Sequence, residues 1–185
     1  TMGIHDTQFD FLLEEGEAFT APEVLLSFSS EGLGKLSRNY HKAIRQNICR
    51  GKFKNARRPI LINNWEATYF GFDTDKLLEI ARQAKEVGIE MLVMDDGWFG
   101  KRNDDNSGLG DWVVNETKLP GGLKRLVDGV NEIGLKFGIW YEPEMVSEDS
   151  DLYREHPDWA LKVPGHSLTR GRNQLVLDFS REDVR

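Results

Sequence analysis

Hydrophobic positions after residue 59 fall into short apolar runs separated by amphipathic stretches. The runs are residues 60–62, 91–94, 137–141 and 175–177, and each ends in polar residues. Between them, apolar residues spaced three and four apart predict helices over 74–87 and 123–133, which Gly88 and Gly134 end. Asp73 or Thr74 is suited to cap the first of these helices. Buried-type strands that alternate with helices predict an α/β fold with a parallel sheet.

The first 56 residues follow a different pattern. Phe9, Phe11 and Leu13 alternate with polar residues, and residues 24–28 form another apolar run, so this part reads as two strands. Two strands alone are marginally stable in water, and we therefore expect them to be the tail of a larger sheet. A helical stripe begins near Leu36 and ends near Gly51. The predicted organisation has three parts: strands from a larger sheet over residues 1–30, a linking helix over 31–56, and alternating strands and helices over 57–185.

Two architectures fit the alternating part. A doubly wound sheet usually carries a glycine-rich phosphate loop after its first strand, and residues 63–66, Asn-Asn-Trp-Glu, are unlike one. A (β/α)8 barrel places its functional residues directly after each strand, as this chain does, so we predict a TIM barrel. A whole barrel needs about 250 residues. We therefore expect residues 57–185 to hold its first four strands only, as a fragment.

Composition narrows the class of protein. The chain has 185 residues, 39% of them hydrophobic, a net charge of −7 and one cysteine, which excludes an intrachain disulfide. There is no apolar run long enough for a membrane span and no signal-peptide pattern at residue 1, so we expect a cytoplasmic protein without membrane or nucleic-acid partners. Residues 35–58 hold nine basic side chains and no acidic one. A solvated helix explains them better than an anion site.

Carboxylates and aromatic residues gather where the predicted strands end. Asp95 and Asp96 could chelate a divalent ion, accept hydrogen bonds from vicinal sugar hydroxyls, or simply form a turn. Glu142 and Glu144 could act as acid and base, orient a substrate or pair with basic residues. Arg172, taken alone, reads as a surface arginine. Aromatic faces stack on sugar rings, and several lie at the strand ends or in the loop 97–120: Trp65, Trp98, Phe99, Trp112, Trp140 and Tyr141.

These aromatic residues together with the carboxylate pairs favour a carbohydrate site. The four histidines show no metal-binding spacing.

Several long motifs resemble the α-galactosidases of glycoside hydrolase family 36. They are RPILINNWEATYF, DDGWFG, LGDW, LKFGIWYEPEMVS, DLYREHPDW and GRNQLVLDFSREDVR. The resemblance implies retaining hydrolysis of terminal α-linked galactose, as in melibiose or raffinose, by a TIM barrel that needs no metal or organic cofactor. It also implies that residues 1–30 are the end of an amino-terminal β-sandwich domain, and that the whole protein is a homo-oligomer.

The resemblance assigns site residues one by one. It implies that Asp95 and Asp96 hold galactose hydroxyls, that Trp65 and Trp140 wall the subsite, and that Arg172 lines it. Glu142 and Glu144 match an EPE motif without a catalytic assignment.

No catalytic residue is expected in this chain, and this is a departure from the family. Family 36 carries its nucleophile in a Lys-x-Asp motif, which is absent here, so we expect the nucleophile and the acid/base beyond Arg185 and an inactive isolated chain. The alternatives are a galactosyl transferase of the raffinose-synthase kind, an α-N-acetylgalactosaminidase, or a non-catalytic carbohydrate-binding or oligomerising half-barrel.

Overall fold

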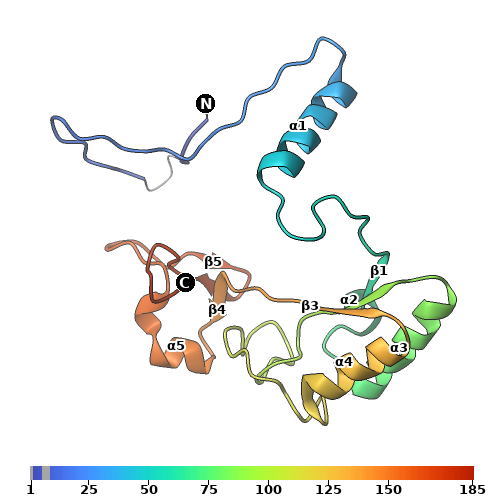
Figure 1. Ribbon diagram of the computed structural model, residues 1–185. Helices are drawn as coiled ribbons and strands as arrows, with labels where there is room; N and C mark the ends of the chain where they lie inside the picture. Colours follow the sequence, from blue (N-terminus) through green and yellow to red (C-terminus); the bar gives the residue numbers. More distant parts are fainter. Residues whose placement is uncertain (1, 6–8) are drawn as a thin grey trace. The chain divides into compact units, whose positions relative to one another are not determined.

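A computed structural model describes residues 2–5 and 9–185 of the chain, which divide into two compact units (Figure 1). The first unit is Thr1–Arg58 and the second is Pro59–Arg185. Each unit is described by itself. The finer division into 1–30, 31–56 and 57–185 stays a prediction.

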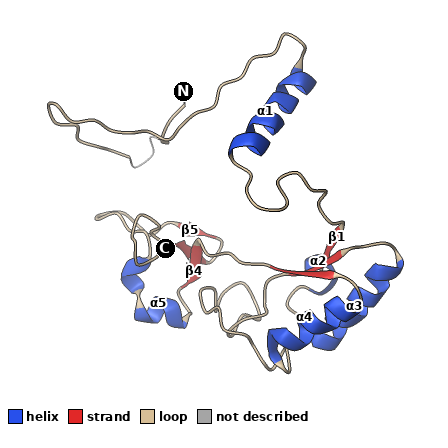
Figure 2. Cartoon of the chain, viewed as in Figure 1, coloured by secondary structure: helices blue, strands red, loops and turns tan. Residues whose placement is uncertain are grey.

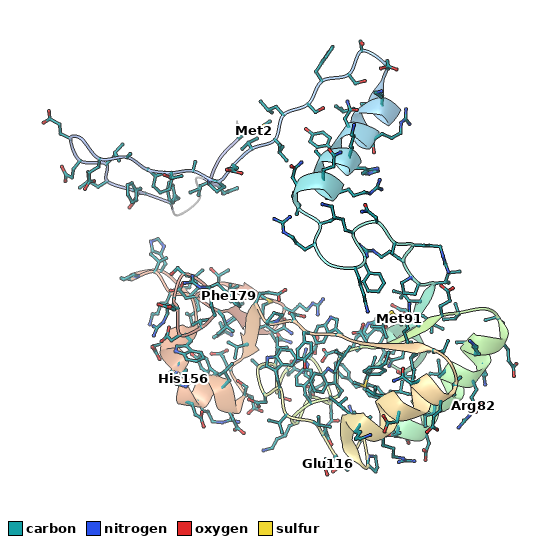
Figure 3. All side chains as sticks on the ribbon, viewed as in Figure 1. Met2, Arg82, Met91, Glu116, His156 and Phe179 are labelled. Carbon is teal, nitrogen blue, oxygen red and sulfur yellow. The ribbon has the colours of Figure 1, made fainter. Side chains whose placement is uncertain are left out.

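The strands expected in residues 1–30 do not form in the part that is described, residues 2–5 and 9–30. Phe11 is 53% exposed and Phe28 is 85% exposed. Figure 3 shows this part of the chain as a ribbon without strands, with its side chains drawn as sticks. The physical reason is that a strand needs a paired neighbour to satisfy its backbone groups, and alternation alone does not supply one.

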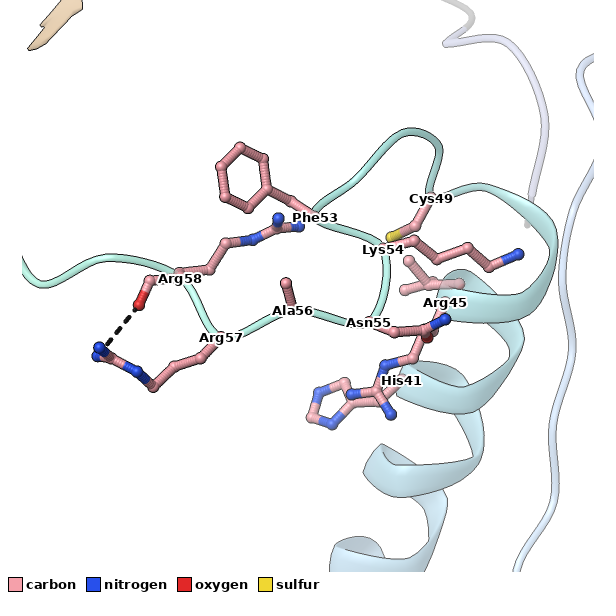
Figure 4. A pocket seen from close by; sticks show the side chains of 10 residues that line it. His41, Arg45, Cys49, Phe53, Lys54, Asn55, Ala56, Arg57 and Arg58 are labelled. Atoms are coloured by element: carbon pink, nitrogen blue, oxygen red, sulfur yellow. Dashed lines mark hydrogen bonds between the residues drawn. The ribbon is translucent and has the colours of Figure 1, made fainter. Parts of the chain in front are cut away.

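Within residues 2–5 and 9–58, the helix α1 (Leu33–Asn47) is the only regular secondary structure. It begins after Gly32, whose φ of 83° no other residue adopts without strain, and it lies inside the predicted linking segment. Its last turns and the following residues border a hollow of about 570 Å³. Figure 4 shows that Arg45, Lys54, Arg57 and Arg58 contribute its basic lining.

The second unit is built on a three-stranded parallel sheet (Figure 2). Its order is β1 (Leu61–Asn63), β2 (Met91–Met94) and β3 (Lys136–Ile139), with Ile62 opposite Leu92 and Leu92 opposite Phe137. The connections contain α2 (Trp65–Thr68), α3 (Thr74–Glu86) and α4 (Gly122–Glu132). The predicted parallel α/β arrangement is therefore confirmed for these three strands.

Local signals explain where the helices begin. The Asp73 side chain accepts from the Lys76 backbone N–H at 2.8 Å and so caps α3, which decides between the two candidates Asp73 and Thr74. The buried face of α3 carries Leu77 and Ala81, which pack with Leu126 of α4 and Leu92 of β2 in one core. Figure 1 shows α3 and α4 lying side by side along the sheet.

The fourth predicted strand lies in a different sheet, which corrects the expectation of four parallel strands. Residues of the run 175–177 form β6 (Gln174–Val176), which pairs antiparallel with β4 (Met145–Ser147) and β5 (Arg170–Gly171). A buried apolar run reads the same in parallel and antiparallel sheets, and the pairing with β4 decides between them. Around this sheet lie the short helix α5 (Asp151–Glu155) and the 3-10 turn η1 (Pro157–Trp159).

Within residues 2–5 and 9–185, no helix combines the length and the apolar character that crossing a membrane requires.

Candidate functional site

The ends of the three parallel strands bring most of the predicted site residues to one edge of the sheet. Asn63 is the last residue of β1, and Trp65 lies just beyond it. Asp95 and Asp96 follow β2, and Trp140 follows β3. The ladder continues past the strands, because the Asn64 N–H donates to the Val93 carbonyl and the Trp140 N–H to the Met94 carbonyl. The carboxyl edge of such a sheet is where ligands usually bind in α/β proteins.

Asp95 lies half-buried at the centre of this edge. Asn63 Nδ2 donates to Asp95 Oδ2, and the Asp96 backbone N–H donates to Asp95 Oδ1 at 2.7 Å. The Asn64 side chain, fully buried, accepts from the Asp95 backbone N–H at 2.7 Å. These contacts hold the carboxylate in place while each oxygen keeps a lone pair for another donor.

Asp96 faces inward and forms a buried ion pair with Arg102. The Asp96 residue is 5% exposed and Arg102 is not exposed at all. Arg102 Nε lies 3.0 Å from Asp96 Oδ1 and Arg102 Nη2 lies 2.9 Å from Asp96 Oδ2, which is the forked geometry of a strong arginine–carboxylate pair. The two adjacent acids therefore differ: Asp95 is half-buried at the edge, and Asp96 is anchored beneath it.

The loop 97–120, which carries Arg102, was expected to contribute aromatic residues to the site, but Arg102 itself was not singled out. Arg102 Nη1 also donates to the Ser107 carbonyl at 3.1 Å, which folds the loop around the guanidinium. The available signal was a lone arginine six residues after an acidic pair, in a stretch rich in aromatic residues. Sequence spacing alone does not distinguish such an arginine from a solvated one.

A buried glutamine joins Arg102 to Glu142. Gln174 of β6 is 1% exposed. In the amide orientation that satisfies both neighbours, its nitrogen donates to Glu142 Oε1 at 2.9 Å and its oxygen accepts from Arg102 Nη2 at 3.1 Å. Gln174 directly precedes the apolar run 175–177 that was predicted as a strand, and nothing local marks it as part of a site.

Glu142 is half-buried, and its surroundings disfavour its charged form. Burial, and next the nearby charge of Glu144, raise the pKa of Glu142. The positive charges of Arg172 and Arg102 lower this pKa, and the negative charge of Asp96 raises it further. The pKa of Glu142 therefore lies above its ordinary value. Glu144 is exposed, and its backbone carbonyl accepts from the Leu177 N–H at 3.0 Å.

Arg172 is exposed in the tight turn between β5 and β6. Its φ of 55° is unusual for a residue with a side chain, because this left-handed region is crowded for L-residues. Its positive charge lowers the pKa of Glu142.

The aromatic residues fall into two groups. Trp98 and Phe99 are fully buried and belong to the core, and the half-buried Trp112 and Trp140 pack against it. The Trp98 indole N–H donates to the Trp140 carbonyl at 3.1 Å, which fixes the backbone where β3 ends. Trp65 stands apart: it is half-buried and makes an edge contact with Phe70 at 5.0 Å between ring centroids.

Phe70 and Lys118 complete the support beneath the acidic pair, and neither was expected from the sequence. The Lys118 ammonium donates to the carbonyls of Gly97 and Arg102, at 2.9 and 3.3 Å, and lies 5.9 Å from the Phe70 ring centroid. Burial lowers the pKa of Lys118, and the charge of Asp96 partly opposes this. The Arg102 guanidinium lies 5.8 Å from the same ring.

The chemistry of this edge suits a neutral, polyhydroxylated ligand. Carboxylate and amide oxygens accept hydrogen bonds from hydroxyl groups, and the neighbouring tryptophans offer apolar faces. Within residues 2–5 and 9–185, no group of three or more His, Cys, Asp or Glu side chains could hold a metal ion.

Comparison with known proteins agrees with this chemistry. The sequence model of the Melibiase family matches residues 18–185. The chain is 58% identical to the bifunctional α-galactosidase/sucrose kinase AgaSK of Mediterraneibacter gnavus, over all of this chain and 20% of that protein. The crystal structure of the GH36 α-galactosidase AgaA of Geobacillus stearothermophilus superposes with a TM-score of 0.88 at 57% identity, covering 98% of this chain and 25% of that one.

A variant of AgaA solved in complex with raffinose gives the same TM-score of 0.88 at 56% identity, over 98% of this chain and 25% of that one. The chain thus spans a quarter or less of the length of the relatives named here. The resemblance to family 36 α-galactosidases that the motifs indicate is confirmed. Because the family model covers all but the first 17 residues, the chain belongs to the Melibiase family.

Proposed function

We propose that this chain forms part of the galactose-binding subsite of a retaining α-galactosidase that hydrolyses terminal α-linked galactose. The observation that carries the proposal is the half-buried carboxylate of Asp95 at the end of the central strand, held by Asn63 and by the Asp96 backbone N–H. Trp65 and Trp140 follow the strands on either side. The arrangement supplies hydroxyl acceptors between two aromatic residues.

In this proposal Asp95 accepts hydrogen bonds from the sugar directly, and Asp96 contributes through the lone pairs that Arg102 leaves open. Trp65 and Trp140 wall the sugar ring, and Arg172 lines the subsite. The binding of raffinose by an AgaA variant supports an α-galactoside oligosaccharide as the substrate class.

The three parallel strands would belong to a (β/α)8 barrel. Their parallel order and the polar residues at their carboxyl ends support this. The mechanism would be double displacement, in which one carboxylate attacks C1 and a second protonates the leaving oxygen. Both carboxylates would come from outside this chain, so the isolated chain is expected to turn over no substrate. A homo-oligomeric state and a cytoplasmic location stay predictions.

Names of the relatives favour hydrolysis over galactosyl transfer, because AgaSK and AgaA are both called α-galactosidases. A chimera tests the proposal: this chain replaces the matching 184-residue segment of AgaA. We expect the chimera to hydrolyse an aryl α-galactoside and raffinose.

Asp95→Asn in the chimera should abolish most of that activity, whereas the exposed Asp128→Asn on α4 is the matched control and should retain it. A folded Asp95→Asn chimera with unchanged kcat/KM would refute the role of Asp95. Turnover by the rigorously pure 185-residue chain would refute the expectation that the catalytic carboxylates lie elsewhere.

A further inference from the structure

Arg102 belongs to a buried hydrogen-bond network that joins four segments of the second unit. Its guanidinium contacts Asp96 at the end of β2, the Ser107 carbonyl in the loop 97–120, and Gln174 in β6. Gln174 in turn contacts Glu142 after β3. The Arg102 side chain is wholly buried, so no water substitutes for these partners.

A purely structural ion pair needs only the two charges. Here every nitrogen of the Arg102 guanidinium has a partner. The partners lie on different segments of the chain, and Gln174 is 72 positions from Arg102 in the sequence. A planar guanidinium fixes the direction of each hydrogen bond it makes, whereas an ammonium does not. Arg102 therefore determines the orientation of the Asp96 carboxylate.

Gln174 extends this geometry to a second carboxylate. Its amide is buried between Arg102 and Glu142, and both of its polar groups are used there. An amide that accepts on one side and donates on the other transmits position without adding charge. The orientation of Glu142 thus depends on the orientation of Arg102.

We propose that Arg102 is the positioning residue of the galactose-binding face, holding Asp96 directly and Glu142 through Gln174, so that carboxylates at the ends of two adjacent strands keep fixed places. The proposal rests on the proposed function. It deepens that function, because it makes a buried arginine and a buried glutamine, neither of which touches the sugar, determinants of affinity.

The test uses the 185-residue chain and methyl α-D-galactopyranoside as the probe. Gln174→Leu breaks the connection to Glu142 and leaves the Arg102–Asp96 pair in place, and Arg102→Lys keeps a positive charge but not the fork. Leu175→Val is the matched control, because Leu175 is equally buried on the same strand but packs in a separate hydrophobic cluster with Val146 and Leu177. Amide NMR spectra establish that each variant is folded.

Two quantities are measured: the dissociation constant, from shifts of the indole N–H signals, and the titration of the Glu142 carboxyl carbon. We expect Gln174→Leu and Arg102→Lys to weaken binding by about tenfold or more, since the loss of one hydrogen bond between a hydroxyl and a carboxylate is worth roughly tenfold or more in affinity. We expect both variants to raise the midpoint of the Glu142 titration. Gln174→Leu removes the hydrogen bond that Gln174 donates to the Glu142 carboxylate, and Arg102→Lys removes the fork that holds Gln174 in place for it. The other facing charges, Glu144, Arg172 and Asp96, are unchanged in both variants. Leu175→Val should change neither quantity.

The proposal is overturned if folded Gln174→Leu keeps the affinity of the unmodified chain. If the unmodified chain itself does not bind the probe, then it is the proposed binding function that fails in the isolated chain. The Glu142 titration alone then decides the positioning role: an unmoved midpoint in both variants overturns it, and a raised midpoint in both supports it.

Discussion

Removing Arg102 should destabilise the second unit far more than removing an exposed arginine. In Arg102→Met, Asp96 would remain 5% exposed and would lose the guanidinium that forms its ion pair. Breaking a buried pair by deleting one partner costs about 3–5 kcal/mol, because a buried charge is left uncompensated. This is a large fraction of the ~5–15 kcal/mol that stabilises a typical domain.

Urea unfolding followed by tryptophan fluorescence measures the effect. All five tryptophans lie after residue 58, so the signal reports on the second unit alone. With a urea dependence of about 1.5–3 kcal/mol/M, a loss of this size lowers the midpoint by roughly 1–3 M. The matched control is Arg125→Met, since Arg125 pairs with Asp75 at 2.7 Å while 47% exposed and should lose about 0–1 kcal/mol.

The double variant Asp96→Asn with Arg102→Met separates charge from packing. It leaves no buried charge, so it should be more stable than Arg102→Met alone. The reasoning is refuted if Arg102→Met loses no more than the Arg125→Met control, or if the double variant is less stable than Arg102→Met.

Three further predictions concern ionisation, close packing and capping. Burial, and next the charge of Glu144, raise the pKa of Glu142 above its ordinary value of 4.5. Between the unfolded and the folded pKa, the native state therefore binds more protons than the unfolded state does. The contribution of Glu142 to the free energy of unfolding is full below this pH window and falls as pH rises through it. Glu142→Gln should remove this fall in urea midpoints measured from pH 4 to 8. Gly97→Ala should cost about 1–3 kcal/mol in urea unfolding, because φ is 102° and the new methyl would lie 2.8 Å from Phe70 Cδ1. Asp73→Ala should cost about 1 kcal/mol in the same assay through loss of the α3 cap, and an unchanged midpoint would contradict that role.

Local patterns predicted the elements of the second unit well. The strand Met91–Met94 occupies the residues of the predicted run, and α4 (Gly122–Glu132) lies within one residue of the predicted helix. Asp73, one of the two candidate caps, caps α3. These features depend on neighbours within a few residues, such as an apolar run, a helical stripe or a side chain that reaches the next turn. A single sequence contains that information directly.

The positions of candidate site residues were predictable where these residues directly follow a predicted strand. Asp95, Asp96 and Trp65 follow apolar runs, and the parallel order of β1, β2 and β3 brings them to one edge. The different environments of the two acids were not predictable. Which of them faces inward depends on the position of Arg102, and that position depends on how the loop 97–120 folds.

The sequence by itself determined the family, the alternation of strands and helices, and the acidic and aromatic chemistry at the strand ends. Tertiary structure decided that β6 pairs antiparallel with β4, and that Arg102 and Gln174 join Asp96 to Glu142. The reason is that pairing and burial depend on contacts between segments distant in sequence. The same apolar run can form a parallel or an antiparallel strand, and the same arginine can be buried or solvated. The partners that each meets in the folded chain decide between these alternatives.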